Sequence, residues 1–464
     1  MSFSIVDTVR QACDVCLLIG PGGPVETEKI ESGRYGGQQA CGAGKLQTIR
    51  SGERMDRMHT SSTAEVDIPS HVRPEQVHTF DIYSDPRLLK DVHTGYRALQ
   101  LEAPEIFFTP RNGGHWMVTR YDLIETVIKD TNNFSNRELE VPKTRSPFVA
   151  IPINLDPPEH TPYRKMLMRH FTPRMVADLE TQMHDWATRL IDKVYDAGTC
   201  DFAEQLGALY PVTIFMELAG LPLDRYVEFR EIVTEFFSHI TKERRIELQR
   251  QIFFELETVF RARMEKPRDD LFSRLVAEEI DGRKLTMDEL LSIGFLLFVA
   301  GLDTVANALT FAFHFLAQHP EIQDRLIADP AAIPKFVDEA MRRFPVTNGV
   351  REIRNDIELG GAQLRAGEMI VAPMTLAGLD DRRNPDPESF DIDRQRRQHI
   401  SFSTGPHLCL GHYLAKAEMR IFIGEFLRRI PRFELADGFV PKFRAGIVMA
   451  LETLPITWRA APET

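Results

Sequence analysis

The sequence predicts a mainly α-helical fold with small β-sheets (an α+β protein), and three observations carry that prediction. Apolar residues recur at helical spacing through most of residues 160–345, with proline and glycine at the breaks. Residues 350–375 instead alternate apolar and polar side chains between glycines, as strands do. No internal repeat and no linker is evident after residue 66. We therefore expect one mixed, helix-dominated domain over residues 61–464.

Shorter elements surround this pattern. The apolar, β-prone run at residues 114–119 predicts a strand, and residues 121–129 then predict a helix. Residues 410–430 have the spacing of an amphipathic helix, and residues 431–458 have the pattern of short strands. Strands are thus expected on both sides of the helical middle.

The longest predicted helix, residues 293–317, is apolar nearly all round, which is typical of a buried helix or a membrane span. Asp303, Thr304 and Asn307 lie at its centre, where insertion into a bilayer is costly. The preceding residues 286–289 (Thr-Met-Asp-Glu) form a capping box of the kind that starts helices in water. We therefore predict a helix buried inside a soluble protein.

Residues 1–60 are rich in glycine and lack a periodic apolar face, so we expect a disordered N-terminal extension or a mis-assigned start. Met55 and Met58 are plausible alternative starts. Charged residues interrupt the first 20 residues and no basic stretch precedes an apolar core, so no signal peptide is predicted. The expected location is the cytoplasm.

The composition disfavours several functional classes. The chain has 464 residues, of which 43% are hydrophobic and 27% charged, an ordinary globular balance. The net charge of −12 disfavours non-specific binding to nucleic acids or to a membrane surface. The five cysteines are an odd number in a long chain, which argues against a disulfide framework. Cys13 and Cys16 form a C-x-x-C pair, but no second pair follows at the spacing of a zinc site.

Residues 402–411 (Phe-Ser-Thr-Gly-Pro-His-Leu-Cys-Leu-Gly) predict a loop that delivers a cysteine to the start of a helix. Cys409 lies close to that helix start, where the helix dipole favours a thiolate. Gly405 and Gly411 remove side chains where a flat cofactor could approach the backbone. Taken alone, a buried structural cysteine is the simpler interpretation.

Two further motifs lie within predicted helices. Residues 300–304 (Ala-Gly-Leu-Asp-Thr) place a carboxylate and a hydroxyl in the middle of the apolar helix, where an unpaired charge is costly. Glu339 and Arg342 have i, i+3 spacing, which puts both charges on one helix face. Each motif has a structural alternative: a kink with a buried ion pair for the first, and a surface ion pair for the second.

Together, in this order, the three motifs resemble those of the cytochrome P450 family of haem-thiolate monooxygenases: F-x-x-G-x-x-x-C-x-G, A-G-x-D-T and E-x-x-R. The resemblance covers about residues 66–460. Residues 112–116, 156–159, 301–305 and 407–411 are most similar to the soluble bacterial enzymes that hydroxylate camphor and related monoterpenes. The resemblance implies a triangular helical prism around a buried haem b.

The resemblance also implies roles for individual residues. Cys409 would be the thiolate ligand of the haem iron, and four basic side chains would hold the haem propionates. These four are His160, Arg164, Arg351 and His407. Asp303 and Thr304 resemble the acid–alcohol pair that supplies protons when O2 is activated, whereas Glu339 and Arg342 resemble a structural pair.

The third member of that structural network departs from the family pattern. The family usually has an arginine or histidine within P-x-R-F, and the corresponding residues 387–390 are Pro-Glu-Ser-Phe. Serine cannot complete a charge network. We therefore expect Arg394 or a neighbouring loop residue to take this place.

The positions that match the family's substrate pocket are nearly all apolar. They are Phe148, Leu296, Val299, Ala300, Thr347, Ile447 and Val448. Phe148 stands where the camphor-hydroxylating enzymes carry a tyrosine that hydrogen-bonds the substrate ketone, and a phenyl ring offers no donor. We expect a compact hydrocarbon-like substrate, such as a monoterpenoid, a terpene ether or a norisoprenoid.

Electrons must come from another protein, because no G-x-G-x-x-G follows a predicted strand and no flavin or nicotinamide module is evident. The resemblance implies a [2Fe–2S] ferredoxin with its ferredoxin reductase, O2 as co-substrate, and a monomer. In the family Arg164 lies at the docking face, and Arg394, Arg396 and Arg397 are expected to add positive charge there.

Alternative functions remain at this point. An enzyme of this type could act on another small apolar substrate, aromatic or fatty, or a haem sensor or a peroxygenase could use the same cysteine. The intact Asp303–Thr304 pair argues against the sensor and the peroxygenase, neither of which needs it. A cysteine hydrolase is disfavoured because no His–Asp arrangement is anchored near Cys409 in the sequence.

Overall fold

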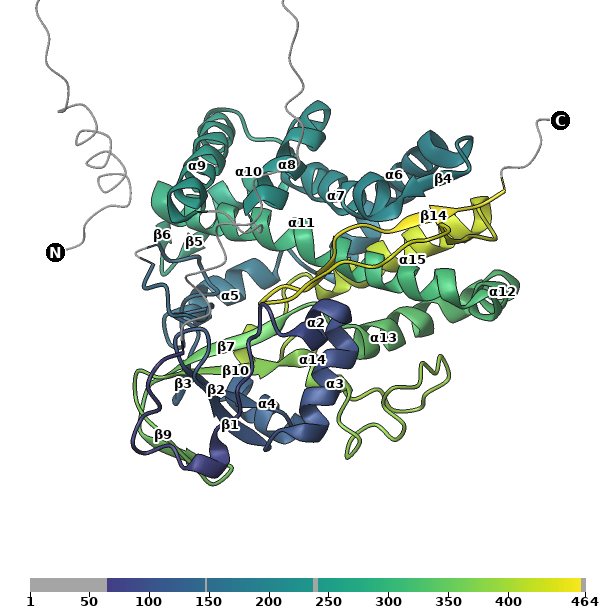
Figure 1. The fold of residues 1–464 in the computed structure, drawn as a ribbon. Coiled ribbons are helices and arrows are strands. Elements are labelled where there is room, and N and C mark those ends of the chain that lie inside the picture. The colour runs from purple at the N-terminus through teal and green to yellow at the C-terminus, as the bar shows by residue number, and fades with distance from the viewer. Residues whose placement is uncertain (1–64, 147, 237–240, 460–464) are drawn as a thin grey trace, which may run out of the picture. The chain divides into compact units, whose positions relative to one another are not determined.

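Helices are the commonest element in the computed structural model, which describes residues 65–146, 148–236 and 241–459 (Figure 1). In chain order the helices are α2 (Pro86–Lys90), α3 (Val92–Glu102), α4 (Tyr121–Lys129), α5 (His160–Met168), α6 (Pro173–Tyr195), α7 (Leu209–Ala219), α8 (Tyr226–Phe236), α9 (Lys242–Glu265), α10 (Leu271–Ala277), α11 (Met287–Gln318), α12 (Pro320–Ala328), α13 (Ile333–Arg343), α14 (Met374–Gly378) and α15 (His412–Arg429).

The strands of the described residues are short and form one five-stranded sheet and four smaller ones. They are β1 (Ile106–Thr109), β2 (His115–Val118), β3 (Phe134–Ser135), β4 (Thr199–Asp201), β5 (Glu279–Ile280), β6 (Arg283–Lys284), β7 (Asn348–Ile353), β8 (Ile357–Leu359), β9 (Ala362–Leu364), β10 (Met369–Pro373), β11 (Glu434–Leu435), β12 (Phe443–Arg444), β13 (Ala450–Leu451) and β14 (Pro455–Thr457). The large sheet has the order β1-β2-β10-β7-β3, in which β2 and β10 run parallel. The predicted mainly α fold with small sheets is confirmed.

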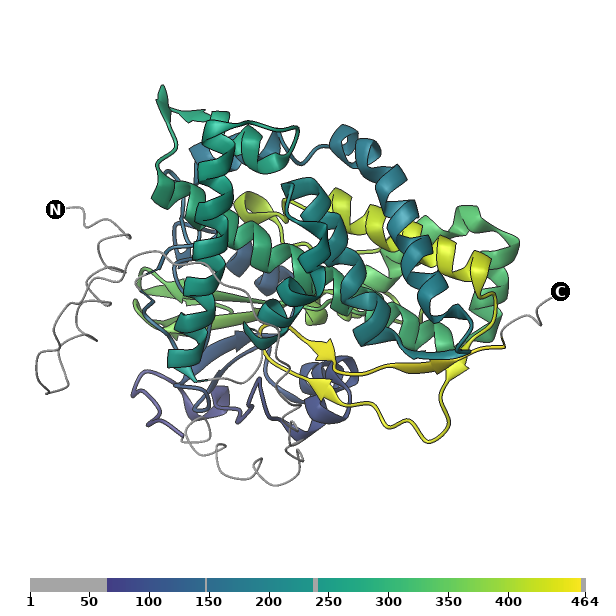
Figure 2. The same ribbon diagram turned by 90° about the horizontal axis from the view of Figure 1, so that it is seen from above.

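Helix α11 runs through the centre of the described chain, between the large sheet and the helices α7 to α9 (Figures 1 and 2). It begins as the capping box predicts, since the Thr286 hydroxyl accepts from the Glu289 N–H and Glu289 accepts from the Thr286 N–H. Among the described helices it is the one long and apolar enough to cross a membrane. Its packing against α7, α8, α9 and α15 accounts for this apolar surface.

Two clusters of buried apolar side chains form the core, and α11 belongs to both. Its first half, up to Leu302, packs in a cluster with residues of α7, α9 and α10. Its second half, from Val305 onward, packs in a larger cluster with residues of α6, α15 and the large sheet. The change from one cluster to the other therefore falls on the predicted Asp303–Thr304 motif.

The predicted short elements agree closely with the structure. Residues 114–119 contain β2, residues 121–129 form α4, and residues 410–430 contain α15. The segment predicted as short strands after residue 430 contains β11 to β14, which run beside the helices in Figure 2. Local patterns were sufficient for these elements: α4 has a periodic buried face, whereas β2 is buried at all four positions and was marked by its short apolar run.

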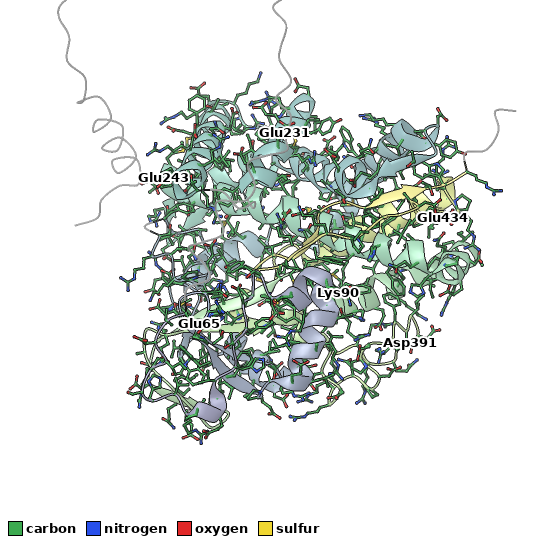
Figure 3. The ribbon with its side chains drawn as sticks, viewed as in Figure 1. Glu65, Lys90, Glu231, Glu243, Asp391 and Glu434 are labelled. Atoms are coloured by element: carbon green, nitrogen blue, oxygen red, sulfur yellow. The ribbon has the colours of Figure 1, made fainter. Side chains whose placement is uncertain are left out.

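Charged side chains of both signs cover the surface of the described residues. Figure 3 labels examples from different parts of the described chain, and each of them is exposed. They are Glu65, Lys90, Glu231, Glu243, Asp391 and Glu434. This mixture accords with the moderate net charge of −12.

The predicted N-terminal extension, residues 1–60, lies outside the described residues, as do Cys13 and Cys16. It stays a prediction, and expression from Met58 tests it. Because residues 1–57 lack a periodic apolar face, their removal is expected to leave haem content and melting temperature unchanged. Loss of haem from the shortened chain would contradict this expectation.

Candidate active site

One face of the middle of α11 keeps accessible surface although the rest of the helix is a core element. Ala300 is exposed, and Leu296, Val299, Asp303 and Thr304 are partly exposed. These positions recur at three- and four-residue spacing, which places them on a single helix face. The predicted motif and the predicted α11 pocket residues therefore share one accessible face.

Asp303 forms an ion pair across to the C-terminal strands. Its Oδ2 lies 3.4 Å from Nη2 of Arg444 on β12, and the two side chains are only 15% and 16% exposed. Burial raises the pKa of Asp303, whereas Arg444 and the Asn307 amide act to lower it. The structural alternative predicted a buried ion pair with a kink. The ion pair is present, and α11 continues as an α-helix through this segment.

Thr304 turns its hydroxyl toward the backbone of its own helix. The hydroxyl donates to the Ala300 carbonyl over 3.1 Å, a common arrangement for threonine within helices. Its oxygen lone pairs remain able to accept a hydrogen bond. A partly buried carboxyl and a hydroxyl are therefore adjacent on the accessible face.

Cys409 lies in a loop that runs directly into α15. Gly405 has a φ of +66°, which a side chain would strain, and the Cys409 N–H donates to the Phe402 carbonyl over 2.7 Å. A Cβ built on Gly411 would meet no atom within 4 Å, so this side of the loop is open. The two predicted glycines therefore act differently: Gly405 allows the turn and Gly411 leaves space.

The electrostatics of Cys409 correct one expectation. Burial raises the pKa of the thiol, while the Gly411 N–H and Arg164 lower it. The helix-dipole argument predicted that the start of α15 favours a thiolate. Because the pKa of the thiol is raised overall, the start of α15 alone does not produce one. A bound cation such as iron deprotonates a thiol ligand directly, so the site is suited to a thiolate only together with its metal.

The predicted propionate partners lie together. The rings of His160 and His407 have centroids 4.5 Å apart, and the fields of Arg351 and Arg164 both act on His407. Arg164 also donates to the Leu408 carbonyl and so ties α5 to the cysteine loop. Four basic side chains from three segments of the chain thus gather beside Cys409.

Two of these groups are buried hydrogen-bond donors without an acceptor. Asn136 places its side-chain N–H group 3.4 Å from Nδ1 of His407, so Nδ1 accepts and the proton lies on Nε2, which is buried and has no partner among the described residues. Nε of Arg351 is likewise buried and finds no acceptor in the part of the chain that the structure describes. Buried donors require acceptors. Carboxylates such as haem propionates supply them, and the residues present therefore fit a haem.

Burial disfavours the charged forms of the two histidines. Burial, followed by the field of Arg351, lowers the pKa of His407 to about 3, and burial also lowers the pKa of His160. A carboxylate beside either ring would act in the opposite direction, because a nearby negative charge favours the imidazolium. The role of all four basic side chains toward the propionates therefore stays a prediction.

Glu339 and Arg342 form a fully buried pair rather than the surface pair of the structural alternative. Both side chains are 0% exposed, and two hydrogen bonds of 3.0 and 2.7 Å join them. Arg342 also donates to the carbonyls of Gly378, Pro387 and Ser389. The pair therefore anchors the long loop that follows α14.

Arg394 completes this network, as expected. Its Nε lies 3.1 Å from Glu339 Oε1, and Arg397 lies 3.4 Å from the other carboxylate oxygen. The expectation that both arginines add charge to a docking face is therefore wrong, because they are only 10% and 17% exposed and face Glu339. Arg396 is exposed.

The predicted pocket residues outside α11 come from three segments. Phe148 packs edge-on against Phe295 and Phe253, with ring centroids 5.1 and 5.3 Å apart. Thr347 forms a backbone bridge with Val448, and its hydroxyl lies 3.5 Å from the sulfur of Met374. The Thr347 hydroxyl, which is the polar group among the predicted pocket side chains, therefore already contacts another side chain of the protein. Ile447 is partly exposed beside Val448.

Sequence reasoning missed several residues around this site. Arg444 is 141 positions from Asp303, and no local pattern marks it. Asn136, which sets the tautomer of His407, is even farther from its partner, at 271 positions. The phenylalanines at positions 253 and 295 carried the ordinary pattern of core residues on predicted helices.

Comparisons with a family model and with known proteins point to the same family as the motifs. The Cytochrome P450 family model matches residues 200–449. The probable cytochrome P450 127A1 of Sinorhizobium fredii is 32% identical over 401 residues, which cover 84% of this chain and 97% of that protein. Nocardicin C N-oxygenase of Nocardia uniformis is 31% identical over 392 residues, or 81% and 98%.

Solved structures of cytochromes P450 also match the fold of this chain. The crystal structure of CYP101J2 matches with a TM-score of 0.80 and 35% identity, over 85% of this chain and 100% of that one. That of CYP101C1 matches with a TM-score of 0.80 and 31% identity over the same shares. Given the family model, these relatives and a site whose donors suit a haem, the chain belongs to the cytochrome P450 family and is a monooxygenase that uses haem b and O2.

Proposed function

We propose that this enzyme hydroxylates a small apolar compound, most suitably a monoterpenoid or related terpenoid, with electrons from a [2Fe–2S] ferredoxin and its reductase. One observation carries the proposal: a carboxyl and a hydroxyl stand beside apolar side chains on a single accessible face of α11. We further propose a cytoplasmic monomer whose single domain is residues 61–464. Cysteine usage and the need for an external electron donor support this location.

The haem would be held from two directions. Cys409 would supply the thiolate to the iron, while Arg351 and His407 would donate their unpartnered N–H groups to the propionates. His160 and Arg164 lie in the same group and would support them. When bound, the haem supplies the activation of O2 and the oxidation of a C–H bond.

Asp303 and Thr304 would handle protons beside that centre. Thr304 holds its hydroxyl hydrogen on the Ala300 carbonyl, so its oxygen can accept a hydrogen bond from water. Burial raises the pKa of Asp303 and the cationic Arg444 opposes this, which suits a group that both accepts and releases a proton. Together they would move protons from solvent into an otherwise apolar region.

The pocket side chains would select the substrate by shape. Phe148, Leu296, Val299, Ala300, Ile447 and Val448 have no polar side-chain atoms. The Thr347 hydroxyl already faces the Met374 sulfur, so a substrate would find few hydrogen bonds here. Binding would therefore depend on apolar burial, which favours rigid hydrocarbon-like molecules over polar ones.

The electron donor would dock beside Cys409. Met168, Leu408 and Tyr413 are exposed apolar side chains near this loop, at 53%, 37% and 47%. Lys165 is exposed on α5, whose Arg164 contacts Leu408. An apolar patch with a lysine suits a small acidic protein.

The alternative function is oxidation of another small apolar molecule, aromatic or fatty. The names of two relatives support a wider range of substrates within the family: they are a nocardicin C N-oxygenase and a steroid C26-monooxygenase. A non-catalytic haem sensor is disfavoured because it would not need Asp303 and Thr304.

Two measurements test the proposed function. Reduced protein with carbon monoxide should show a Soret band far to the red of that of histidine-ligated haem. Camphor, 1,8-cineole, β-ionone and lauric acid, each titrated into ferric protein, should then be ranked by the spectral shift and by product formed with ferredoxin, reductase and NADH. Lauric acid as the best substrate would favour the alternative.

Thr304→Ala is expected to uncouple the enzyme without weakening substrate binding. The hydroxyl offers little packing, and the pocket side chains stay in place, so the binding free energy should change by less than about 1 kcal/mol. NADH consumption should continue while product per NADH falls and hydrogen peroxide rises. The three quantities are measured together, with Thr310→Ala as a control because Thr310 makes the same hydroxyl contact on α11 but is buried. If the product formed per NADH is unchanged in Thr304→Ala, the proton-handling role assigned to Thr304 is wrong.

A further inference from the structure

Arg444 lies on a segment that contacts both parts of the proposed site. In β12 it pairs with Ala450 of β13, so residues 445–449 form the connection between these two strands. Ile447 and Val448, the predicted substrate contacts, lie in that connection. The guanidinium of Arg444 reaches Asp303 on α11, 3.4 Å away. One short segment thus carries pocket side chains and the cationic partner of the proton-handling carboxyl.

The backbone of this connection is held firmly to the start of β7. The Asn348 N–H donates to the Ile447 carbonyl over 2.9 Å, and its side-chain amide donates to the Gly446 carbonyl over 2.7 Å. The Met449 N–H donates to the Val346 carbonyl over 2.8 Å. A push on Ile447 or Val448 should therefore move this connection as a unit, together with the paired strand that carries Arg444, instead of being absorbed within a loose loop.

Arg444 favours the charged form of Asp303. The carboxyl is 15% exposed in an apolar helix, and burial raises its pKa. Among the described residues, the charged group that lowers this pKa is Arg444, and on α11 itself the Asn307 amide adds to it. At 3.4 Å the pair lies near the limit of hydrogen bonding, so a small movement of Arg444 changes the interaction.

We propose that Arg444 is a positioning residue that holds the Asp303 carboxylate for proton transfer and makes proton delivery sensitive to how the substrate seats against Ile447 and Val448. This inference rests on the proton role proposed for Asp303. A substrate that fits leaves the pair in place, whereas one that pushes this segment away from α11 weakens it. The second kind of substrate should release more hydrogen peroxide per electron consumed.

The first experiment replaces Arg444 and follows pH. In Arg444→Gln the carboxyl loses its cation, its pKa rises further, and the acid limb of the kcat profile should move up by about 1 pH unit. Arg444→Lys keeps the charge and should return the limb toward its original position. Arg429→Gln is the matched control, because Arg429 pairs with Asp192 in an exposed ion pair at 3.0 Å. An unmoved acid limb in Arg444→Gln would overturn the proposal.

A double-mutant cycle that combines Arg444→Gln with Asp303→Asn distinguishes a failure of this proposal from a failure of the proposed function. If Asp303→Asn leaves turnover and its pH profile unchanged, the proton role of Asp303 itself is wrong. If Asp303→Asn slows turnover but Arg444→Gln does not, only the role of Arg444 is wrong. The double variant should be no slower than Asp303→Asn alone. Thermal melting gives a readout without turnover: the double variant should melt no lower than Arg444→Gln, because that single variant leaves the Asp303 carboxyl buried without this cation and the double variant does not.

The coupling to the pocket is tested with two probes of different bulk, camphor and β-ionone. In the unaltered enzyme the fraction of NADH recovered as hydrogen peroxide should differ between them by about twofold or more, which corresponds to a small free-energy difference. In Arg444→Gln that difference should disappear, since the link is broken. A difference of the same size in both proteins would overturn the coupling.

Discussion

Cys409→Ser should abolish both the red-shifted carbon monoxide spectrum and the monooxygenase activity. Serine preserves the shape of the loop, including the hydrogen bond from the backbone of residue 409 to the Phe402 carbonyl. It offers an alcohol in place of a thiol, and an alcohol does not form the electron-rich ligand that haem oxygenation chemistry requires. Turnover should fall by more than the roughly 10–100-fold that follows loss of an outer-shell partner. The checks are the spectrum of the reduced protein and product formation.

The chain offers a matched control in Cys200. This cysteine is also buried, on β4, where burial raises its pKa to about 12. Cys200→Ser removes a sulfur from the core but should retain the spectrum and most of the activity. A Cys409→Ser protein that kept both the red-shifted band and full turnover would show that another residue binds the iron.

Arg342→Met should strongly destabilise the folded protein. It removes the shortest ion pair of Glu339, a carboxylate at 0% exposure, and leaves only the longer contacts from Arg394 and Arg397. It also removes the donors for the carbonyls of Gly378, Pro387 and Ser389. Breaking a buried pair in this way costs about 3–5 kcal/mol, against a typical total stability of about 5–15 kcal/mol. Denaturant unfolding and the haem content of the purified protein measure the effect.

Arg428→Met is the control for this change. Arg428 pairs with Glu425 at the same i, i+3 spacing, but its side chain is 64% exposed. Its loss should therefore cost no more than about 1 kcal/mol. If the two variants were equally stable, the Glu339–Arg342 network would not have the anchoring role that its burial indicates.

Much of the fold was predictable because its signals are local. The capping box at Thr286 marks the start of α11 within a few residues, and α4 matches its predicted range of 121–129. The Glu339–Arg342 pair follows from helical spacing alone. Its burial did not follow, because the spacing is the same for a surface pair.

The rest of the site depends on contacts that the sequence does not encode locally. Arg444 meets Asp303 only through the packing of β12 against α11. Arg394 and Arg397 fall close to one another in the sequence as part of a basic run, yet the fold turns both toward Glu339. The protonation of His407 likewise depends on its burial near Arg351, and on the amide of Asn136. Such features emerge only when distant segments pack together.

The division of α11 between two core clusters has a consequence for protein engineering. Side chains before Leu302 pack with α7, α9 and α10, and those after Val305 pack with the sheet and α15. Substitutions that reshape the first half can then alter substrate range with little repacking of the large sheet, whereas Leu410 of the cysteine loop packs against the same cluster as that half. Mutations in the two halves should combine additively where they share no contact, and non-additively where both touch a side chain that borders the two clusters, such as Leu414. This boundary is therefore a place to divide a combinatorial library.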